Sequence, residues 1–350
     1  MTQTAPTRIA VAGAGYIGQA HMAAAHQAPG VALSAVVDPS PAAQAVAQAA
    51  GVPLYASLDE LLARDRPDGL VLATPNHLHL PQALWAVQAG LPILLEKPIA
   101  TTVAEGRQIV EATERLGARV LIGHHRAHSP IMDKAQQVVR SGQLGRLVAV
   151  TGSATFYKPD IYFADGPWRK EPGGGPILLN MIHEVHNLRM LCGGIVAVQA
   201  FQSHATRGFA VEDTVAINLR FASGVLGSFM LSDTAASARS WEQTSQENKA
   251  YPSYGDEDCY VVSGTNGSLS VPTMRLKTYP RPEERSWWKP FEVGTVGMVR
   301  EDPILRQMVH FGEVARGEAE PKVSARDGLD NLRVTEAIAE AAATGRVVEL

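Results

Sequence analysis

The stretch Ile9-Ala10-Val11-Ala12-Gly13-Ala14-Gly15-Tyr16-Ile17-Gly18 decides the fold. Its four apolar residues predict a buried strand, and a glycine-rich turn then leads into residues 19–28, whose composition favours a helix. Gly13, Gly15 and Gly18 have the G-x-G-x-x-G spacing. In that motif the first glycine permits a tight turn, the second lets the backbone approach a pyrophosphate, and the third lets helix pack on strand. Taken alone, the same spacing also occurs in turns that serve packing only.

A carboxylate at the end of the next strand sharpens this interpretation. Residues 31–37 predict a second strand, and Asp38 follows it, twenty residues after Gly18. A carboxylate at that distance accepts hydrogen bonds from the adenosine ribose of a dinucleotide. Asp38 would repel a 2′-phosphate, and Pro39-Ser40 supplies no arginine to neutralise one. The pattern therefore predicts NAD as the cofactor, in preference to NADP.

Composition limits the remaining function classes. The chain has 350 residues, 45% of them hydrophobic, with a formal net charge of -4. This length favours two domains, and the charge argues against nucleic acid as a partner. Two cysteines make no disulfide framework, the start at residues 1–7 is polar, and no apolar run is long enough to span a membrane. We expect a cytoplasmic protein without a membrane partner.

The first third of the chain alternates strand and helix. Short apolar strands are predicted at 70–73, 93–95 and 120–122, each after a helical segment. Repeated units of this kind indicate an α/β fold with a doubly wound parallel sheet, which we place at residues 1–125 as a dinucleotide-binding Rossmann domain. Ligands of such sheets lie beyond the carboxyl ends of the strands. The segments that follow residues 73, 95 and 122 are therefore where we expect functional side chains.

Residues 126–350 show a different pattern and predict a substrate and oligomerisation domain of α+β type. Longer strands at 148–156, 196–203, 215–221 and 225–231, with hairpin signals at 221–224 and 264–267, indicate a large, mostly antiparallel, open sheet. A helix at 176–191 interrupts them, and helices at 303–316 and 325–343 close the chain and can pack back on the first domain. The open face of the sheet predicts a homodimer or homotetramer.

Four motifs occur in an order typical of one protein family. They are the glycine-rich turn, Thr74-Pro75-Asn76-His77-Leu78-His79, Glu96-Lys97-Pro98, and Gly173-Gly174-Gly175 followed by His183. In these motifs the chain resembles the glucose–fructose oxidoreductase/inositol dehydrogenase (Gfo/Idh/MocA) family. The resemblance implies a Rossmann domain, a C-terminal α/β domain, and hydride transfer between nicotinamide and a hydroxyl of a sugar, polyol or related compound.

The resemblance also implies catalytic roles for three residues. Lys97 resembles the family lysine between nicotinamide and substrate, where an ammonium stabilises a developing oxyanion. His183 matches the family histidine that acts as acid and base. The aspartate that usually stands four residues before this histidine is Leu179 here, and Asn180 is the nearest polar substitute. Asparagine can orient a hydroxyl but cannot accept its proton, so the usual relay is altered.

Cofactor-binding residues are expected at the glycine turn and at the ends of the strands, with Arg126 and Trp168 near nicotinamide and substrate. The full set is Gly13, Gly15, Tyr16, Ile17, Asp38, Thr74, Pro75, Asn76, His79, Glu96, Lys97, Arg126 and Trp168.

We expect no metal site. His183 and His186 lie one helical turn apart, and His124 and His125 occur elsewhere, but no cysteine or acidic partner stands at a characteristic interval.

Other interpretations remain open. Lys97 could be a surface lysine at the end of a strand. Asn180, His183, Glu184 and Asn187 share one stripe of a regular helix and could be its solvated face. The same family fold also carries glycosidases that use the dinucleotide without net redox change. A dinucleotide-sensing protein with a decayed catalytic helix is the third possibility, and Leu179 and His186 are its suggestive features.

Overall fold

The computed structural model describes residues 5–350, and the first four residues of the polar N-terminal stretch lie outside it. Contacts divide the chain into two units. Unit 1 comprises Met1–His128 and Asp302–Leu332, and unit 2 comprises Ser129–Glu301 and Arg333–Leu350. Each unit is described in turn.

Unit 1 is built on a sheet of six parallel strands in the order β3-β2-β1-β4-β5-β6. This is the strand order of a Rossmann fold, with the turn after β1 at the point where the order reverses. The strands β1, β4, β5 and β6 are buried almost throughout, as expected for a sheet covered on both faces. Their bounds are β1 Thr7–Ala12, β2 Val31–Val37, β3 Leu54–Tyr55, β4 Gly69–Leu72, β5 Ile93–Leu95 and β6 Val120–Ile122.

The helices of unit 1 have clear local start signals. Thr102 and Glu105 form a capping box at α5, and the side chains of Ser57 and Asp302 cap α3 and α10. In unit 2, the side chain of Ser129 caps α6 in the same way. Helix α10 packs against α1 within this unit. The bounds are α1 Tyr16–Gln27, α2 Ala43–Ala50, α3 Leu58–Arg64, η1 Asn76–Leu78, α4 His79–Gln88, α5 Val103–Leu116, η2 His125–His128 and α10 Pro303–Arg316; α6, Pro130–Arg140, belongs to unit 2.

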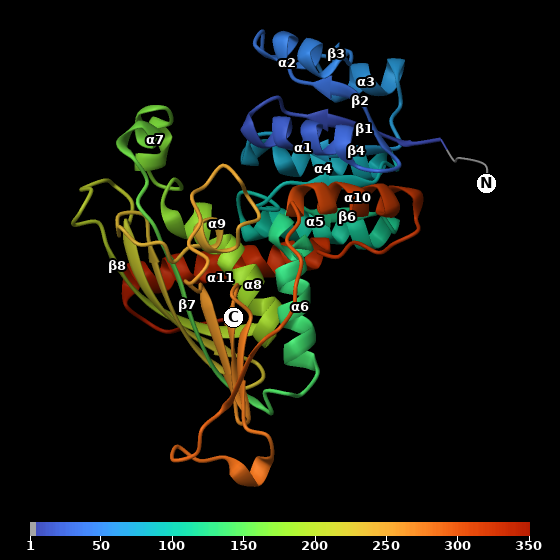
Figure 1. Ribbon diagram of the computed structural model, residues 1–350. Coiled ribbons are helices and arrows are strands. Elements are labelled where there is room, and N and C mark those ends of the chain that lie inside the picture. The colour runs from blue at the N-terminus through green and yellow to red at the C-terminus, as the bar shows by residue number, and fades with distance from the viewer. Residues whose placement is uncertain (1–4) are drawn as a thin grey trace. The chain divides into compact units, whose positions relative to one another are not determined.

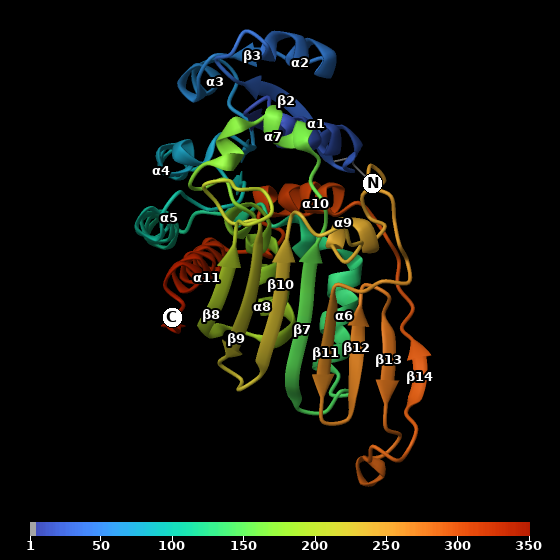
Figure 2. The same ribbon diagram turned by 90° about the vertical axis from the view of Figure 1, so that its left-hand side faces the viewer.

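Unit 2 contains a sheet of nine strands in the order β14-β13-β12-β11-β7-β10-β9-β8-β15. All neighbours are antiparallel except β7 and β10, which are parallel (Figure 2). The predicted hairpins join β9 to β10 and β11 to β12. The bounds are β7 Leu147–Thr155, β8 Ile195–Ser203, β9 Thr214–Phe221, β10 Leu226–Ser232, β11 Tyr260–Gly264, β12 Gly267–Val271, β13 Arg275–Thr278, β14 Glu292–Thr295 and β15 Val348–Glu349.

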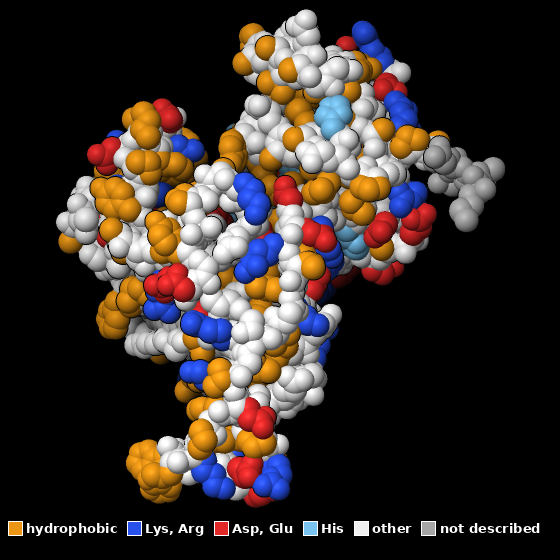
Figure 3. All heavy atoms as spheres, in the orientation of Figure 1, with side chains coloured by type: hydrophobic (Ala, Val, Ile, Leu, Met, Phe, Trp, Pro, Cys, Tyr) orange, Lys and Arg blue, Asp and Glu red, His pale blue; other side chains and the backbone are white. Residues whose placement is uncertain are grey.

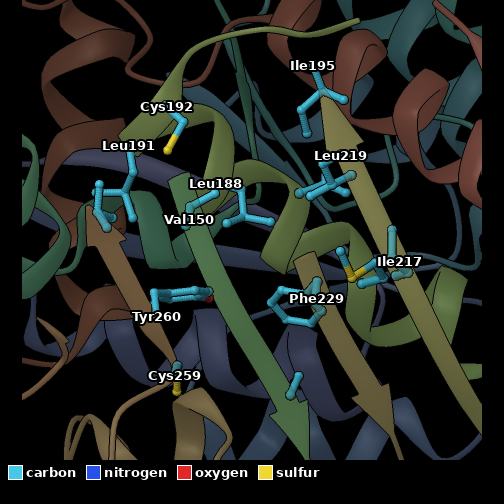
Figure 4. Packing of buried hydrophobic residues seen from close by; sticks show 14 of the residues in the cluster. Val150, Leu188, Leu191, Cys192, Ile195, Ile217, Leu219, Phe229, Cys259 and Tyr260 are labelled. Atoms are coloured by element: carbon cyan, nitrogen blue, oxygen red, sulfur yellow. The ribbon is translucent and has the colours of Figure 1, made fainter. Parts of the chain in front are cut away.

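One face of this sheet is covered by helices, and its core is shown in Figure 4. Leu188, Leu191 and Cys192 of α8 pack with Val150 of β7 and Phe229 of β10 in one buried cluster. The helical elements of unit 2, besides α6, are α7 Asp160–Ala164, η3 Pro167–Lys170, η4 Ile177–Met181, α8 Ile182–Cys192, α9 Trp241–Thr244 and η5 Pro282–Glu284. Helix α11, Ala325–Thr344, is labelled in Figure 1; its residues up to Leu332 belong to unit 1 and those from Arg333 to unit 2.

The predicted fold class is confirmed: a Rossmann-type parallel sheet is joined to an α+β part with a mostly antiparallel sheet. One element differs from its prediction. The helix expected at 176–191 begins with a π-helical turn, η4, and becomes α-helical only at Ile182. Among residues 5–350, no helix combines the length and the apolar composition that crossing a bilayer requires.

Candidate functional site

The three glycines of the first turn serve different purposes. Gly13 has a φ of +98°, and a Cβ there would lie 2.4 Å from the Ala73 carbonyl oxygen. A Cβ on Gly18 would lie 1.9 Å from the Gly13 carbonyl oxygen. Both glycines are therefore required by the packing of the protein itself. A Cβ on Gly15 would meet nothing within 4 Å, so its small size leaves room for a ligand close to the backbone at the start of α1.

Asp38 lies at the edge of a cavity of about 920 Å³, which the glycine turn and Thr74 also line. Its two carboxylate oxygens accept hydrogen bonds from the backbone N–H groups of Ala14 and Ser40, each at 2.8 Å. Burial alone would raise the pKa of Asp38, but the hydrogen bonds from Ser40 and Ala14 outweigh it and lower the pKa. The carboxylate is thus ionised and fixed beside the turn, as ribose binding requires.

The segment after β4 is tied to the segment after β5 through His79. This histidine is buried, and its Nδ1 and Nε2 lie 2.8 Å and 3.0 Å from the carbonyl oxygens of Pro98 and Thr74. Burial lowers the pKa of His79, although both hydrogen bonds oppose that shift. The Thr74 hydroxyl donates to Gln82 at 2.6 Å, while Pro75 and Asn76 are exposed at the loop. His79 therefore holds two loops together, and Pro75 and Asn76 are the accessible members of this motif.

Glu96 holds the backbone of Lys97 in place. One of its buried carboxylate oxygens lies 2.8 Å from Nε2 of His21 in α1, and the other accepts from the Lys97 N–H at 3.1 Å. A Cβ on Gly123 would lie 2.7 Å from the same carboxylate. Burial would raise the pKa of Glu96, but the hydrogen bond and charge of His21, with the charge of Lys97, lower it. Half-buried Lys97 therefore follows an ionised, fixed residue at the carboxyl end of β5.

The other predicted residues of unit 1 lie at the same edge of its sheet. Tyr16 is 84% exposed at the start of α1, and Ile17 beside it is half-buried. Arg126 lies in η2, after β6, and is buried together with His124 and His128. Among the described residues, 5–350, no group of three or more His, Cys, Asp or Glu side chains is arranged to hold a metal ion.

In unit 2, the polar stripe of α8 lies in the interior. His183 is 8% exposed, and Glu184 and Asn187 are fully buried, so these residues are not a solvated helix face. The hydroxyl of Tyr260 donates to Glu184, and the Asn187 amide donates to that hydroxyl at 2.9 Å. A buried polar network of this kind fixes the helix in one position, because each broken bond would leave an unsatisfied group. His183 and His186 thus stand on a rigid, buried element.

The glycines before this helix make room for its start. A Cβ on Gly175 would lie 2.3 Å from a carboxylate oxygen of Glu212, and one on Gly174 would lie 2.5 Å from Arg169 Cα. Glu212 accepts from the Ile177 N–H at 2.8 Å at the first residue of η4. Burial raises the pKa of Glu212 despite that hydrogen bond. Gly174 and Gly175 are therefore packing residues that allow η4 to begin against Arg169 and Glu212, whereas Gly173 has a positive φ of +92° and open space around it.

Asn180, which lies in η4, makes a contact that the sequence pattern did not predict. Lys158 Nζ donates to Asn180 Oδ1 at 2.8 Å and lies 3.7 Å from Oδ2 of Asp233. Trp168 is 54% exposed in η3, and the guanidinium of Arg169 lies 5.2 Å from its ring and 4.0 Å from the ring of Tyr162.

Sequence reasoning missed Lys158, His21 and Tyr260. Lys158 had a usable signal, because Lys158-Pro159 follows a predicted strand just as Lys97-Pro98 does. His21 and Tyr260 had none, because each meets its carboxylate partner from a position 75 or 76 residues away in the chain.

Comparisons with known proteins agree with this architecture. Residues 7–124 match the family described as "Oxidoreductase family, NAD-binding Rossmann fold", and residues 132–270 match the GFO/IDH/MocA C-terminal domain. The 1,5-anhydro-D-fructose reductase of Ensifer adhaerens is 27% identical over 308 residues, 84% of this chain and 83% of the relative. The D-apiose dehydrogenase of Paraburkholderia graminis is 26% identical over 97% of this chain and 89% of the relative.

A solved structure matches this chain over almost its whole length. The WlbA dehydrogenase of Bordetella pertussis, in complex with NADH and UDP-GlcNAcA, has a TM-score of 0.77 and 25% identity, and the match covers 99% of both chains. The fold, the glycine-rich turn and the matches to known families and structures together define an NAD-binding oxidoreductase. More narrowly, the chain belongs to the Gfo/Idh/MocA family, whose relatives include sugar and inositol dehydrogenases.

Proposed function

We propose that this chain is an NAD-dependent dehydrogenase that oxidises a secondary hydroxyl of a sugar, polyol or cyclic hydroxy compound. The observation that carries the proposal is the edge of unit 1. There the open space at Gly15, the fixed carboxylate of Asp38 and the fixed backbone of Lys97 follow the carboxyl ends of β1, β2 and β5 of one parallel sheet. Bound NAD supplies the hydride acceptor in this reaction.

The residues of the chain divide the remaining tasks. Gly15 and the N–H groups at the start of α1 hold the pyrophosphate, and Asp38 accepts from the ribose hydroxyls. The ammonium of Lys97 donates a hydrogen bond to the reacting oxygen and stabilises negative charge on it. The neutral imidazole of His183 accepts the hydroxyl proton, and Asn180 orients the substrate. Pro75, Asn76, Arg126 and Trp168 remain proposed contacts of nicotinamide and substrate.

We propose that the protein is a cytoplasmic homodimer or homotetramer. Cys192 and Cys259 are both buried and neither takes part in a disulfide, which suits a reducing compartment. On the sheet face opposite α6 and α8, Phe201, Leu226 and Met230 are 65%, 60% and 43% exposed. Ala216 pairs with both Met230 and Phe201, which places these two side chains in one row across the sheet. Sedimentation of the wild type against Phe201→Asp tests this surface, and a monomeric wild type would contradict it.

On the face shown in Figure 3, the charged side chains do not form the one-signed patch that a polyanion partner would require. Lys and Arg side chains are intermixed with Asp and Glu on the face shown in Figure 3. A small-molecule substrate is therefore the partner that we propose.

The proposed reaction is tested by incubating the purified chain with NAD and a panel of compounds. The panel contains myo-inositol, D-xylose, D-apiose, D-glucose and L-tartrate, with chromogenic glycosides added as glycosidase substrates. Net NADH formation supports the dehydrogenase. Release of the chromophore without NADH would make the chain a glycosidase that uses NAD transiently, and tight NAD binding without either product would make it a sensor.

A further inference from the structure

The contact between Lys158 and Asn180 settles the orientation of the Asn180 amide. Lysine has only donors, so the atom that meets Nζ at 2.8 Å must be the amide oxygen. The amide nitrogen then points elsewhere, and it donates to no protein atom among residues 5–350. Asn180 is half-buried, so this N–H₂ group is accessible to a bound molecule as a hydrogen-bond donor.

Lys158 is itself held firmly. Its N–H donates to the Asp233 carbonyl oxygen at 2.9 Å, and its own carbonyl oxygen accepts from Arg207 at 2.8 Å. Arg207 also donates from Nε to the Asp233 carboxylate at 2.9 Å. The side chains of Lys158, Asp233 and Arg207 are 11%, 3% and 6% exposed. Charged groups with so little exposure are paired and geometrically defined, so Nζ of Lys158 occupies a set position.

The π-helical turn decides which residue of the helix faces Lys158. π-helical turns are rare and occur frequently at functional sites. Here Ile177–Met181 form such a turn immediately before His183 in the chain, and Asn180 lies within it. Leu179 has no group that could bond with Lys158. The turn therefore presents Asn180 to Lys158, whose ammonium also lies 3.7 Å from Oδ2 of Asp233.

We propose that Lys158 is a positioning residue that holds the Asn180 amide with its oxygen toward the Lys158 ammonium. Asn180 Nδ2 is then free to donate a hydrogen bond to an oxygen of the substrate. The inference rests on the proposed dehydrogenase function and specifies how the substrate is held. Lys158 and Asn180 together replace the substrate-orienting role for which a carboxylate is missing at position 179. The substrate class this fits is one with an oxygen that can accept at that point, beside the hydroxyl that is oxidised.

Lys158→Met tests the lock, because it keeps the length of the side chain and removes the donor. We expect kcat/KM for the fastest substrate of the panel to fall about tenfold to a hundredfold, mainly through a higher KM, since a hydrogen bond to a charged group is lost. The dissociation constant for NAD should not change. Lys158→Arg, which retains donors, should stay within about threefold of the wild type. Lys134→Met is the matched control, because Lys134 also donates to an amide oxygen, that of Gln137, on an exposed helix surface.

A double-mutant cycle with Asn180→Ala separates a lock from two independent roles. Lys158→Met combined with Asn180→Ala should be no worse in kcat/KM than Asn180→Ala alone, within about twofold. The free energies of unfolding, measured by urea denaturation, should also be non-additive. Additive losses in either measurement would overturn the proposal, and so would wild-type kinetics of Lys158→Met.

Asn180→Asp provides a second variant if Lys158→Met does not fold. Aspartate can still accept from Lys158 but has no donor, so kcat/KM should fall while the free energy of unfolding is retained. Wild-type activity of Asn180→Asp would overturn the proposal. A wild-type chain that forms NADH with no panel compound would overturn the proposed function and this inference with it. If the wild type turns over a panel compound but Lys158→Met and Asn180→Ala have independent effects on kcat/KM, only this inference is overturned and the proposed function stands.

Discussion

Polar groups at the edge of the six-stranded sheet are held differently from those around α8. In unit 1, the carboxylates of Asp38 and Glu96 accept from backbone N–H groups, those of Ala14 and Ser40 and that of Lys97. Glu96 also meets one side chain, that of His21. In unit 2, Asn180 and Glu184 are met by the side chains of Lys158 and Tyr260, which lie 22 and 76 residues away in the chain. Backbone donors persist when a neighbouring side chain is replaced, whereas side-chain donors are lost with a single substitution.

The difference has a functional consequence. The cofactor half of the proposed site is built into the turns of the Rossmann sheet and tolerates changes in the surrounding side chains. The substrate half depends on individual side chains, and these can be exchanged without rebuilding the backbone. Such an arrangement lets the substrate side change while the dinucleotide-binding turn is kept, and the names of the relatives differ in substrate.

Lys97→Met should give the largest effect, because it removes the ammonium that we propose to bind the reacting oxygen and leaves its backbone anchor intact. The hydrogen bond from the Lys97 N–H to Glu96 remains, so the loop should keep its position. We expect kcat to fall about a hundredfold to a thousandfold, as for the loss of an oxyanion donor. Titration with NAD should give an unchanged dissociation constant. Joint loss of NAD binding and turnover would instead make Lys97 a structural residue, and near-normal turnover would make it a surface lysine.

His183→Asn should come next, with a loss of about a hundredfold in kcat/KM for alcohol oxidation. A base must be neutral to accept a proton, so the pH–rate profile of the wild type should have an acid limb. The variant should lack that acid limb in a pH–rate profile. His186→Asn, three positions along the same helix, is the control and should retain it. An unchanged profile in His183→Asn would mean that the proton leaves through Lys97 or water.

Two glycine substitutions distinguish a glycine that leaves room for a ligand from a glycine that the packing of the protein requires. Gly15→Ala places its methyl group in open space, so the Tm should stay constant while NAD affinity falls about tenfold. Gly18→Ala drives its methyl group into the Gly13 carbonyl oxygen and should lower the Tm by about 5 °C or more. Calorimetry and NAD titration of both variants provide the measurement. Equal effects of the two substitutions on NAD affinity and on Tm would contradict the distinction.

Asp38 should set the preference between the two cofactors. The wild type should favour NAD over NADP by about tenfold or more in kcat/KM, since the ionised carboxylate repels a 2′-phosphate. Asp38→Ala removes the repulsion and should lower the ratio of kcat/KM with NAD to kcat/KM with NADP. The account of Asp38 fails if the wild type prefers NADP, or if the variant leaves the ratio unchanged.

Glu96→Gln should have the smallest effect of these substitutions. We expect it to change the stability of the fold and the dependence of that stability on pH. The pKa of Glu96 is lowered in the folded chain, so its carboxylate stabilises the fold above the ordinary pKa of glutamate, and this contribution is lost as the pH falls through the lowered value. The Tm difference between wild type and Glu96→Gln should be a few degrees at pH 7 and shrink on acidification. Thermal denaturation from pH 7 down to about pH 2, which passes well below the ordinary pKa of glutamate, checks this. A difference that grows toward acid pH would reverse the assigned direction.

The features held by local backbone were the ones that the sequence predicted well. The turn at Gly13–Gly18, the carboxylate at Asp38 and the loop at Glu96 follow from spacing, because strand, turn and helix occupy consecutive residues. The hairpins at 221–224 and 264–267 are local for the same reason.

The environment of α8 was not predictable in the same way. Regular helical spacing makes Asn180, His183, Glu184 and Asn187 one stripe, but the spacing does not apply across the π-helical turn. The stripe looks solvated in the sequence because its buried partner, Tyr260, comes from a strand far along the chain. The contact of Lys158 with Asn180 likewise depends on how the segment after β7 packs against η4 in three dimensions.

The central claim is that this chain transfers hydride from a carbinol carbon to NAD. The most direct test uses the fastest substrate of the panel, deuterated at its carbinol carbons, with unlabelled NAD and the wild-type chain. Mass spectrometry of the reduced cofactor should show one deuterium per molecule of NADH, formed in equal amount to the oxidised substrate. NADH without deuterium, or consumption of substrate without NADH, would contradict the claim.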